Sequence, residues 1–347
     1  MKSLNQYINE KLKVSKNQNQ YNYYPKTREE LDDLLNQLLE ERGWEADLND
    51  INTSNIIDMS YLFASRRKLN CDISEWNVSN VTNMRGMFDG CKEFKGKCLE
   101  NWDVSNVKYM DSMFAYCNSL DCNLSNWDVS NVKNMYKMFT RCKSFEGKGL
   151  ENWNVSNVTN MCEMFTECKS FEGKGLENWN VSNVKYMDSM FYACESFEGK
   201  GLENWNVSNV INAEYMFAYC NSLDCNLSKW DVSNVTNMNA MFFECKKFKV
   251  KGLENWDVSN VKNMESMFLN CKKLDCNLSN WDVSNVKNMC NMFYGCISFE
   301  GKGLENWDVS NVTNMHNMFL NCTKLNCDLS KWDVSNVTDK HNIFFTL

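Results

Sequence analysis

Residues 150–171 read LENWNVSNVTNMCEMFTECKSF, and this stretch is one copy of a unit that fills most of the 347-residue chain. Its tryptophan recurs every 25 or 26 residues, and a degenerate first copy has Ile51 in the tryptophan place, which makes twelve units from about residue 48. A fixed period of roughly 20–50 residues predicts a solenoid. The repeat tryptophans are Trp76, Trp102, Trp127, Trp153, Trp179, Trp205, Trp230, Trp256, Trp281, Trp307 and Trp332.

The first half of the unit has the pattern of a short strand. Leu150, Trp153, Val155 and Val158 follow L-x-x-W-x-V-x-x-V. This spacing is typical of a leucine-rich repeat, in which alternate side chains of the strand enter the stack. We therefore expect neighbouring units to pair as a parallel sheet on one face.

The second half of the unit changes to a helical period. Its apolar residues fall at i, i+3, i+6, i+7 and i+10, which form one stripe at 100° per residue. Ser156 or Asn157, just before this run, is the expected N-cap. The pattern predicts a short helix of one to three turns. The stripe is formed by Val158, Met161, Met164, Phe165 and Cys168.

These signals together predict an α/β repeat solenoid of about twelve strand–corner–short helix units, similar to a leucine-rich repeat. The return loops are of two kinds, a longer one with glycine, as at 145–150, and a shorter one with cysteine, as at 120–124. One unit alone cannot offset its own loss of chain entropy, so stability has to come from the interfaces between units.

Residues 1–47 lack the repeat and are expected to form an N-terminal helical segment and cap, with the solenoid over 48–347. Thr27 and Glu30 form a capping box, and Gly43 is a suitable residue to end the helix. Residues 1–24 are also expected to begin with a helical stretch. The apolar face of the cap helix is Leu31, Leu34, Leu35, Leu38 and Leu39, and that of the earlier stretch is Leu4, Tyr7, Ile8 and Leu12.

Composition excludes several classes of function. The net charge of −8 gives no basic face for nucleic acid, and no run of 18 apolar residues predicts insertion into a membrane. The two histidines, His316 and His341, lie far apart in sequence and offer little to a catalytic or metal site. We expect no enzyme activity, no cofactor and no metal. The start of the chain has no secretory signal, which favours a cytoplasmic or phage-particle setting.

Ten cysteines recur fifteen residues after the tryptophan place. Each lies on the apolar stripe and is interpreted as a small buried hydrophobe in the reduced state. Oxidised pairs between neighbouring units remain an alternative, whereas a metal site is less favoured because no C-x-x-C pair occurs. The ten are Cys91, Cys117, Cys142, Cys168, Cys194, Cys220, Cys245, Cys271, Cys296 and Cys322.

Asp or Asn follows each repeat tryptophan, as Asn154 follows Trp153, and Ser and Asn come two and three residues later. The preferred interpretation is that these rows satisfy backbone groups at the corner. The alternative is a calcium or glycan site along the same row.

The outward positions of the second half vary most between units, and several hold aromatic residues. On a helical projection, the positions ten and thirteen residues after the tryptophan point away from the core. Exposed aromatic residues in a row are typical of recognition surfaces, so these residues are the candidate partner-binding site. Helix ends tucked under the next unit are the alternative. The candidates are Tyr215 at the tenth position, Tyr192, Phe243 and Tyr294 at the thirteenth, and Tyr116 and Tyr219 on the flanks.

The assembled motif W-[DN]-V-S-N-V-x-N-M-x-x-M-F-x-x-C resembles the BspA-type leucine-rich-repeat surface proteins, a mycoplasma-lipoprotein-like repeat family, over roughly residues 48–347. The resemblance implies a non-enzymatic role in adhesion and protein–protein contact. Its matching positions, such as Trp153, Val155 and Phe165, are scaffold residues, so it implies no catalytic residue.

Three functional hypotheses follow. The first is a non-enzymatic scaffold that binds another protein through its solenoid faces. The second is a structural component of a phage particle or surface appendage that self-associates end to end through the C-terminal unit, in which Lys340 replaces the usual methionine. The third is a glycan-binding solenoid that uses the Asn and Asp row.

Overall fold

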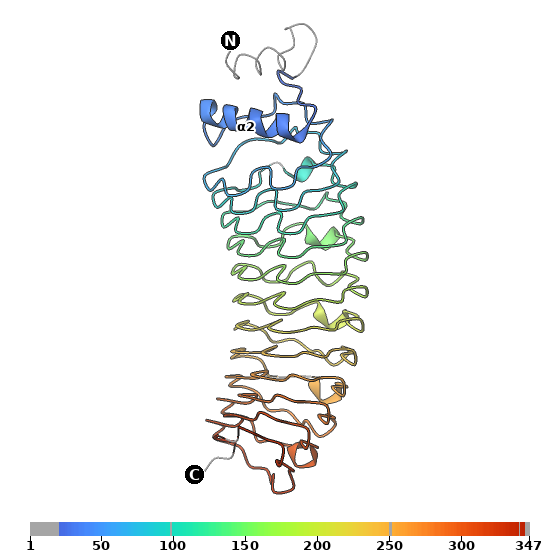
Figure 1. The fold of residues 1–347 in the computed structure, drawn as a ribbon, viewed down its shortest axis with the longest axis vertical. Helices are drawn as coiled ribbons and strands as arrows, with labels where there is room; N and C mark the ends of the chain where they lie inside the picture. Colours follow the sequence, from blue (N-terminus) through green and yellow to red (C-terminus); the bar gives the residue numbers. More distant parts are fainter. Residues whose placement is uncertain (1–20, 98, 250–251, 340, 344–347) are drawn as a thin grey trace.

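The repeat units, called rungs below, lie one above another in a single stack that runs from helix α2 to the C-terminus (Figure 1). The computed structural model describes residues 21–97, 99–249, 252–339 and 341–343. The predicted repeat solenoid is confirmed. The helical stretch expected at the start of the chain, up to residue 20, and the effect of Lys340 on the last rung lie outside the described residues.

The rungs are built from turns, so the strand, the parallel sheet and the short helix predicted for each unit are wrong. Within the described ranges, the α-helix is α2, Arg28–Arg42, and no extended strand occurs. Neighbouring rungs share isolated parallel bridges seven residues after the tryptophan, such as Asn134 with Asn160. Five 3-10 helices lie along one edge of the stack (Figure 1). They are η1 (Leu99–Asn101), η2 (Leu150–Asn152), η3 (Leu202–Asn204), η4 (Leu253–Asn255) and η5 (Leu304–Asn306).

The second half of each rung is a series of three overlapping turns. In the rung of Trp153, the amides of Met164, Thr166 and Cys168 each donate to the carbonyl three residues earlier, at 3.0–3.2 Å. The backbone amides between these point out of the rung and donate to carbonyls of the next rung at 2.7–3.0 Å. These donors are Met161, Glu163, Phe165 and Glu167.

The sequence signal failed here because a helix and a series of turns share the same apolar spacing. Each turn closes between residues i and i+3, so apolar side chains three residues apart still fall on one side. The backbone differs at two positions of each rung, where φ is positive, as at Glu163 (54°) and Glu167 (57°). An α-helix excludes such residues. The positions predicted for the apolar stripe are nevertheless all buried: Val158, Met161, Met164, Phe165 and Cys168.

Aromatic side chains fill the core of the stack. The repeat tryptophans are 2–7% exposed, and each indole Nε1 donates to a carbonyl of the preceding rung at 2.8–3.1 Å. Beside them, the phenylalanines twelve residues after the tryptophan stack at 5.5–5.8 Å between ring centres. A rung therefore completes its core only against a neighbour.

Helix α2 covers the first rung. Its leucine face is buried as predicted, Thr27 accepts from the Glu30 amide at 3.2 Å, and the Gly43 amide donates to Leu39 at 3.0 Å. The Glu30 carboxylate accepts from the Lys26 amide, one residue before the position that a capping box predicts. At the rung itself, Arg28 Nη2 donates to the Ser60 carbonyl at 2.5 Å.

The hydrogen bond from Arg28 takes the place of one that a preceding rung would donate. In the second rung the equivalent carbonyl, that of Arg85, accepts from the Tyr61 amide of the first rung at 2.8 Å. The first rung has no repeat before it, and the guanidinium supplies the donor in its place.

Five of the six longer return loops carry glycine just before their leucine, where two rungs come close, and the loop at 94–99 has Cys98 there instead. Gly149 precedes η2 with φ of 91°, and a Cβ at this residue would lie 2.2 Å from the Ser125 nitrogen of the preceding rung. Gly43, after α2, also has a positive φ of 86°, with ψ of 177°, but nothing lies within 4 Å of its Cβ position. Gly149 therefore combines backbone strain with a steric clash, whereas Gly43 has backbone strain alone.

We expect Gly149→Ala to destabilise the protein more than Gly43→Ala. The backbone strain costs about 1–2 kcal/mol at Gly149, in the left-handed region, and about 1–3 kcal/mol at Gly43, whose ψ of 177° lies in a region that essentially only glycine occupies. Gly149→Ala adds about 1–3 kcal/mol because the rungs must separate. Urea unfolding followed by tryptophan fluorescence measures the difference. Equal losses of stability in the two variants would contradict the close approach of Gly149 to Ser125.

Removing the Arg28 side chain should loosen the first rung alone. Arg28→Ala leaves the Ser60 carbonyl without its donor, at a cost of about 1.5–3 kcal/mol for a hydrogen bond to a charged group. Hydrogen exchange should become faster over residues 51–66 and stay unchanged over 256–296. Arg67→Ala, an exposed arginine of the same rung, is the control. Unchanged exchange in Arg28→Ala would rule out the capping role.

Candidate functional site

Four of the candidate aromatic residues come together on the outer surface. Tyr192 lies edge-on to Tyr215 and Tyr219, with ring centres 6.2 and 5.5 Å apart, and Tyr219 lies 5.1 Å from Phe243. They belong to three successive rungs, those of Trp179, Trp205 and Trp230. We call these four residues the aromatic cluster.

The helical projection misjudged which of these residues is most exposed. The thirteenth position after the tryptophan was expected to point away from the core, yet it is buried at Ala115, Thr140 and Ala218. Tyr192 and Phe243, at this position, are half-buried. Tyr219, at the fourteenth position, was expected on the flank and is 37% exposed. The cause is the turn geometry, to which a projection at 100° per residue does not apply.

The other two candidates lie away from the cluster. The guanidinium of Arg141 lies over Tyr116, 5.2 Å from the ring centre, and Arg141 in turn pairs with Glu167 at 2.7 Å. Tyr294 lies two rungs beyond Phe243, and Asn321 Nδ2 approaches its hydroxyl at 3.5 Å. The candidate site therefore reduces to the four residues of the aromatic cluster.

The aromatic cluster has an acidic environment. Glu167 and Asp188 lie on the N-terminal side, and Glu214 lies next to Tyr215 in sequence. Burial, the neighbouring Tyr219 and the charge of Glu167 raise the pKa of Tyr192. The Tyr192 hydroxyl is therefore a neutral donor and acceptor at physiological pH.

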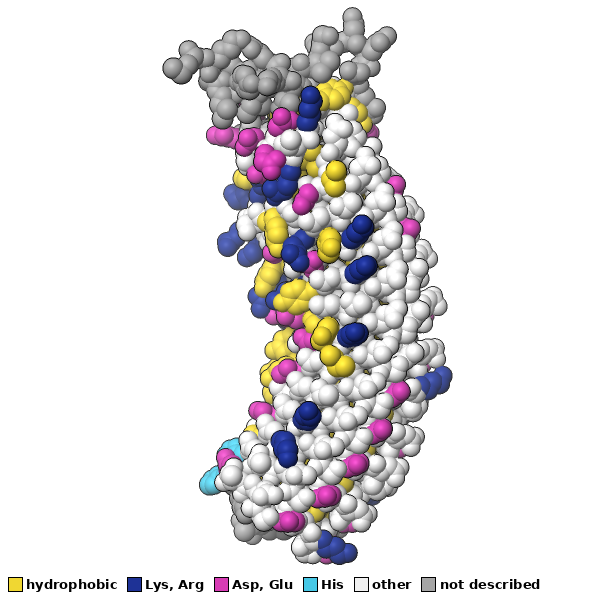
Figure 2. Space-filling view, turned by 45° about the vertical axis from the view of Figure 1, so that its right-hand side comes forward, with side chains coloured by type: hydrophobic (Ala, Val, Ile, Leu, Met, Phe, Trp, Pro, Cys, Tyr) yellow, Lys and Arg dark blue, Asp and Glu magenta, His cyan; other side chains and the backbone are white. Residues whose placement is uncertain are grey.

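Most of the exposed large hydrophobic side chains of the described residues fall between residues 44 and 219. Figure 2 shows hydrophobic side chains gathered on one flank, mixed with charged side chains and beside a column of Lys or Arg side chains. The exposed large hydrophobic residues are Trp44, Ile57, Tyr61, Tyr109, Tyr116, Tyr186, Ile211 and Tyr219, with Ile297 further along.

The row of Asn and Asp residues after the tryptophans holds the corner together, as the sequence predicted. In the rung of Trp153, Asn154 Oδ1 accepts from the Ser156 amide at 3.2 Å, and Asn157 Nδ2 donates to the Ser130 carbonyl of the preceding rung at 2.8 Å. The helix N-cap expected at Ser156 or Asn157 is therefore wrong, because these residues belong to a corner turn. The same bonds recur along the stack, as at Asn180 with Ser182 and Asn183 with Ser156.

The cysteine row is buried and reduced. Each of the ten thiols donates to a phenylalanine carbonyl of the preceding rung at 2.8–3.1 Å, and all seventeen described cysteines are free. Burial raises the pKa of Cys91 to about 12 and that of Cys142 well above its usual range. Cys290 and Cys327 are less buried, and burial raises the pKa of Cys327 to about 11.

The two histidines, judged too far apart in sequence to act together, are stacked on successive rungs. Their rings lie 6.0 Å apart, and His316 Nδ1 is 3.3 Å from Asp339 Oδ1. The missed signal is their separation of 25 residues, which is one repeat. Across the part of the chain that the structure describes, no three His, Cys, Asp or Glu side chains are grouped so as to hold a metal ion.

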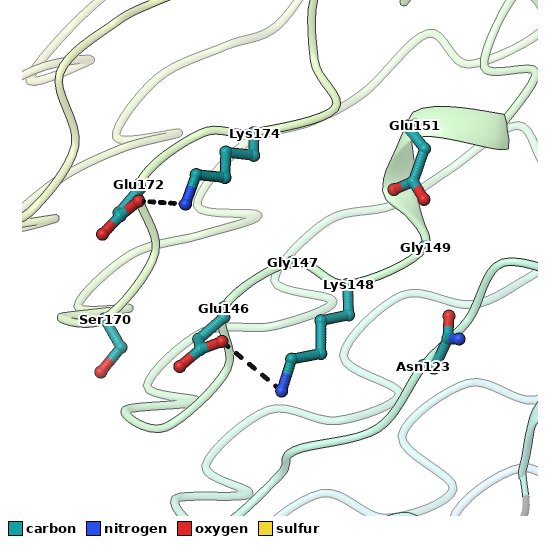
Figure 3. A pocket seen from close by; sticks show the side chains of 9 residues that line it. All are labelled: Asn123, Glu146, Gly147, Lys148, Gly149, Glu151, Ser170, Glu172 and Lys174. Carbon is teal, nitrogen blue, oxygen red and sulfur yellow. Dashed lines mark ion pairs between the residues drawn. The ribbon is translucent and has the colours of Figure 1, made fainter.

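A groove of about 610 Å³ runs between the return loops of two rungs (Figure 3). Its lysines are neutralised by neighbours: Lys148 contacts Asp121 at 2.9 Å and Glu146 at 3.5 Å, and Lys174 contacts Glu172 at 2.7 Å. The groove is polar and shallow and has no aromatic side chain, so it is a weaker candidate than the aromatic cluster. Among the described residues, no helix is long and apolar enough to cross a membrane.

Comparison with known proteins gives one family and a few distant structures. Residues 32–149, 135–251 and 240–347 each match the family described as "Mycoplasma protein of unknown function, DUF285". No curated protein matches the chain.

Among solved structures, a leucine-rich cell surface protein from Faecalibacterium prausnitzii is 16% identical, over 80% of this chain and 76% of that one, with a TM-score of 0.37. A leucine-rich repeat protein from Eubacterium ventriosum is 15% identical, over 72% and 76%, with a TM-score of 0.30. The functional domain of InlJ from Listeria monocytogenes, which includes a cysteine ladder, is 9% identical, over 83% and 58%, with a TM-score of 0.22.

The cysteine geometry predicts a sharp difference in reactivity. In a Cys98→Ser background at pH 8, iodoacetamide should reach only Cys290 and Cys327 in the folded protein. Because a raised pKa lowers the thiolate fraction, Cys327 should react about a hundredfold more slowly than an ordinary exposed thiol. Mass spectrometry locates the label. In denaturant without reductant, all seventeen thiols of this background should react, and a smaller number would mean that neighbouring rungs are oxidised.

Proposed function

The chain belongs to the DUF285 family of Mycoplasma proteins of unknown function, and from that premise we propose that it is a non-enzymatic repeat scaffold that binds another protein through the aromatic cluster. The observation that carries the proposal is the contact of Tyr192, Tyr215, Tyr219 and Phe243 on three successive rungs. Tyrosine is enriched among the residues that dominate binding energy at protein interfaces.

The rigidity of the stack favours binding at this site. The backbone under Tyr192 is fixed, since its amide donates to Ser189 and its carbonyl accepts from Glu167 of the preceding rung at 2.7 Å. Side chains held by such a backbone lose little conformational entropy on association. A preformed aromatic surface can therefore bind without rearranging.

The distribution of variable positions also supports a binding role. The buried positions of the rungs carry nearly the same residues throughout, whereas the outward positions differ from rung to rung. The specificity for a partner that contacts the outward positions would depend on these variable residues and not on the shared core. The finer assignment, a BspA-type protein with a role in adhesion, is part of this proposal.

The proposal predicts loss of a partner when the cluster is truncated. The immobilised chain is used to capture proteins from an extract of its source cells, and the captured partner is identified and titrated. Tyr192→Ala/Tyr219→Ala should weaken its binding at least tenfold, because each interfacial tyrosine of this kind contributes more than about 1 kcal/mol. Circular dichroism must show that the variant is folded.

The matched control is Tyr109→Ala/Tyr186→Ala. These two tyrosines are 49% and 42% exposed and lie outside the cluster, seven residues after their tryptophans. The control should keep wild-type affinity. Equal binding by the folded cluster variant would remove the aromatic cluster as the site.

A further inference from the structure

We propose that the aromatic cluster and the carboxylates beside it dock a cationic segment of the partner, a short stretch of polypeptide that presents arginine or lysine. This inference rests on the proposed function and names the chemistry of the partner. It follows from the charges at the outward positions and from the contacts that tyrosines elsewhere in the chain make with basic side chains.

The outward positions lose their basic residues along the stack. In the four rungs from Trp179 to Trp256, the positions nine, ten, thirteen and fourteen residues after the tryptophan carry four carboxylates and no Lys or Arg. In the four rungs before them the same positions also carry four carboxylates, but three of these pair with a basic residue: Asp111 with Arg85, Glu163 with Lys137 and Glu167 with Arg141. The surface around the aromatic cluster is therefore the acidic part of this face. Its carboxylates are Asp188, Glu214, Glu244 and Glu265.

Three of these carboxylates bond to neutral groups. Asp188 accepts from the Cys162 thiol at 2.7 Å, and Glu265 accepts from Asn288 Nδ2 at 2.8 Å. Glu214 accepts from the amides of two asparagine side chains, Asn237 and Asn239, at 3.0 and 2.7 Å. Glu244 differs, with Lys246 at 3.1 Å. The neutral donors orient Asp188, Glu214 and Glu265 without cancelling their charge.

The chain itself shows how such a surface receives a cation. Arg141 lies over the Tyr116 ring at 5.2 Å and pairs with Glu167 at 2.7 Å. Lys137 lies over the Tyr136 ring at 4.9 Å and pairs with Glu163 at 3.3 Å. In both cases an aromatic ring and a carboxylate hold one basic side chain between them.

Among the described residues, no Lys or Arg side chain lies over the rings of the aromatic cluster, and carboxylates occupy neighbouring outward positions. Tyr219 occupies the same position in its rung as Tyr116, but the next rung has Glu244 where Arg141 follows Tyr116. A guanidinium or ammonium group from a partner would complete the arrangement, through cation–π contact with the rings and charge attraction to Asp188 and Glu214.

The dimensions fit a short segment. Successive rungs at about 4.8 Å place the four acidic rungs over roughly 15 Å, which an extended peptide covers with about five residues. One or two basic side chains in such a stretch would face the cluster. A folded partner with an exposed basic loop presents the same chemistry.

A fluorescein-labelled nona-arginine peptide tests the inference by fluorescence anisotropy at physiological salt. Asp188→Asn/Glu214→Gln should weaken its binding at least fivefold. Tyr219→Ala should weaken it about two- to fivefold, which is the loss expected for one exposed cation–π contact. Tyr186→Ala, the aromatic control, should leave the affinity unchanged.

The matched control for charge is Asp231→Asn/Asp257→Asn, which removes the same two charges from a row where other rungs naturally carry asparagine, as at Asn154 and Asn180. This control should change the affinity less than twofold. If both charge variants weaken binding equally, the peptide responds only to the net charge of −8, and the inference is wrong. Failure of the wild type to bind nona-arginine would also overturn it.

The captured partner separates this inference from the proposed function. If Tyr192→Ala/Tyr219→Ala and Asp188→Asn/Glu214→Gln each lose binding of the partner, the proposed function and the cationic segment are both supported. Loss in the tyrosine variant with full binding by the charge variant leaves the proposed function standing and overturns the cationic segment. If both variants bind the partner fully, the proposed function and the cationic segment are both overturned.

Discussion

The structure depends on backbone amides that a rung cannot satisfy by itself. Met161, Glu163, Phe165 and Glu167 all direct their N–H groups at carbonyls of the next rung, and a buried amide without an acceptor costs as much as a lost hydrogen bond. Because donors face one way and acceptors the other, the stack has a direction. Its first rung presents carbonyls that no repeat can satisfy, which explains why helix α2 precedes this rung and brings Arg28 to Ser60.

The conserved side chains of the unit complete this backbone arrangement. Trp153, Cys168 and Asn157 each donate to a carbonyl of the preceding rung, from the indole, the thiol and the amide respectively. Each lies where an apolar residue of similar size would fill the space but leave a carbonyl without its donor. The repeated residues are therefore required by stacking, and little of their chemistry remains available for function.

The amino-acid pattern predicts the parts of this fold that follow from burial and not those that follow from backbone dihedral angles. The face of α2, the stack itself and the burial of Trp153 and Met161 all follow from apolar spacing. The positive φ at Glu163 leaves no comparable signal, because residues of many types occupy that position in other rungs. The contact between Tyr192 and Tyr219 was also out of reach, since it needs the true direction of each side chain.

The turns explain why one face can vary so freely. The positions ten and fourteen residues after the tryptophan hold Tyr, Lys, Arg, Glu, Ser, Ala, Asn and Gly at positive φ. A bond from the backbone amide to the next rung offsets the strain whatever the side chain is. Substitutions there change the surface without disturbing the core. Tyr116 and Tyr219 show two outcomes of this freedom, because both stand at the fourteenth position and are equally exposed. The rung after Tyr116 places the guanidinium of Arg141 over its ring, whereas the rung after Tyr219 has Glu244 at that position and places Phe243 beside the ring instead.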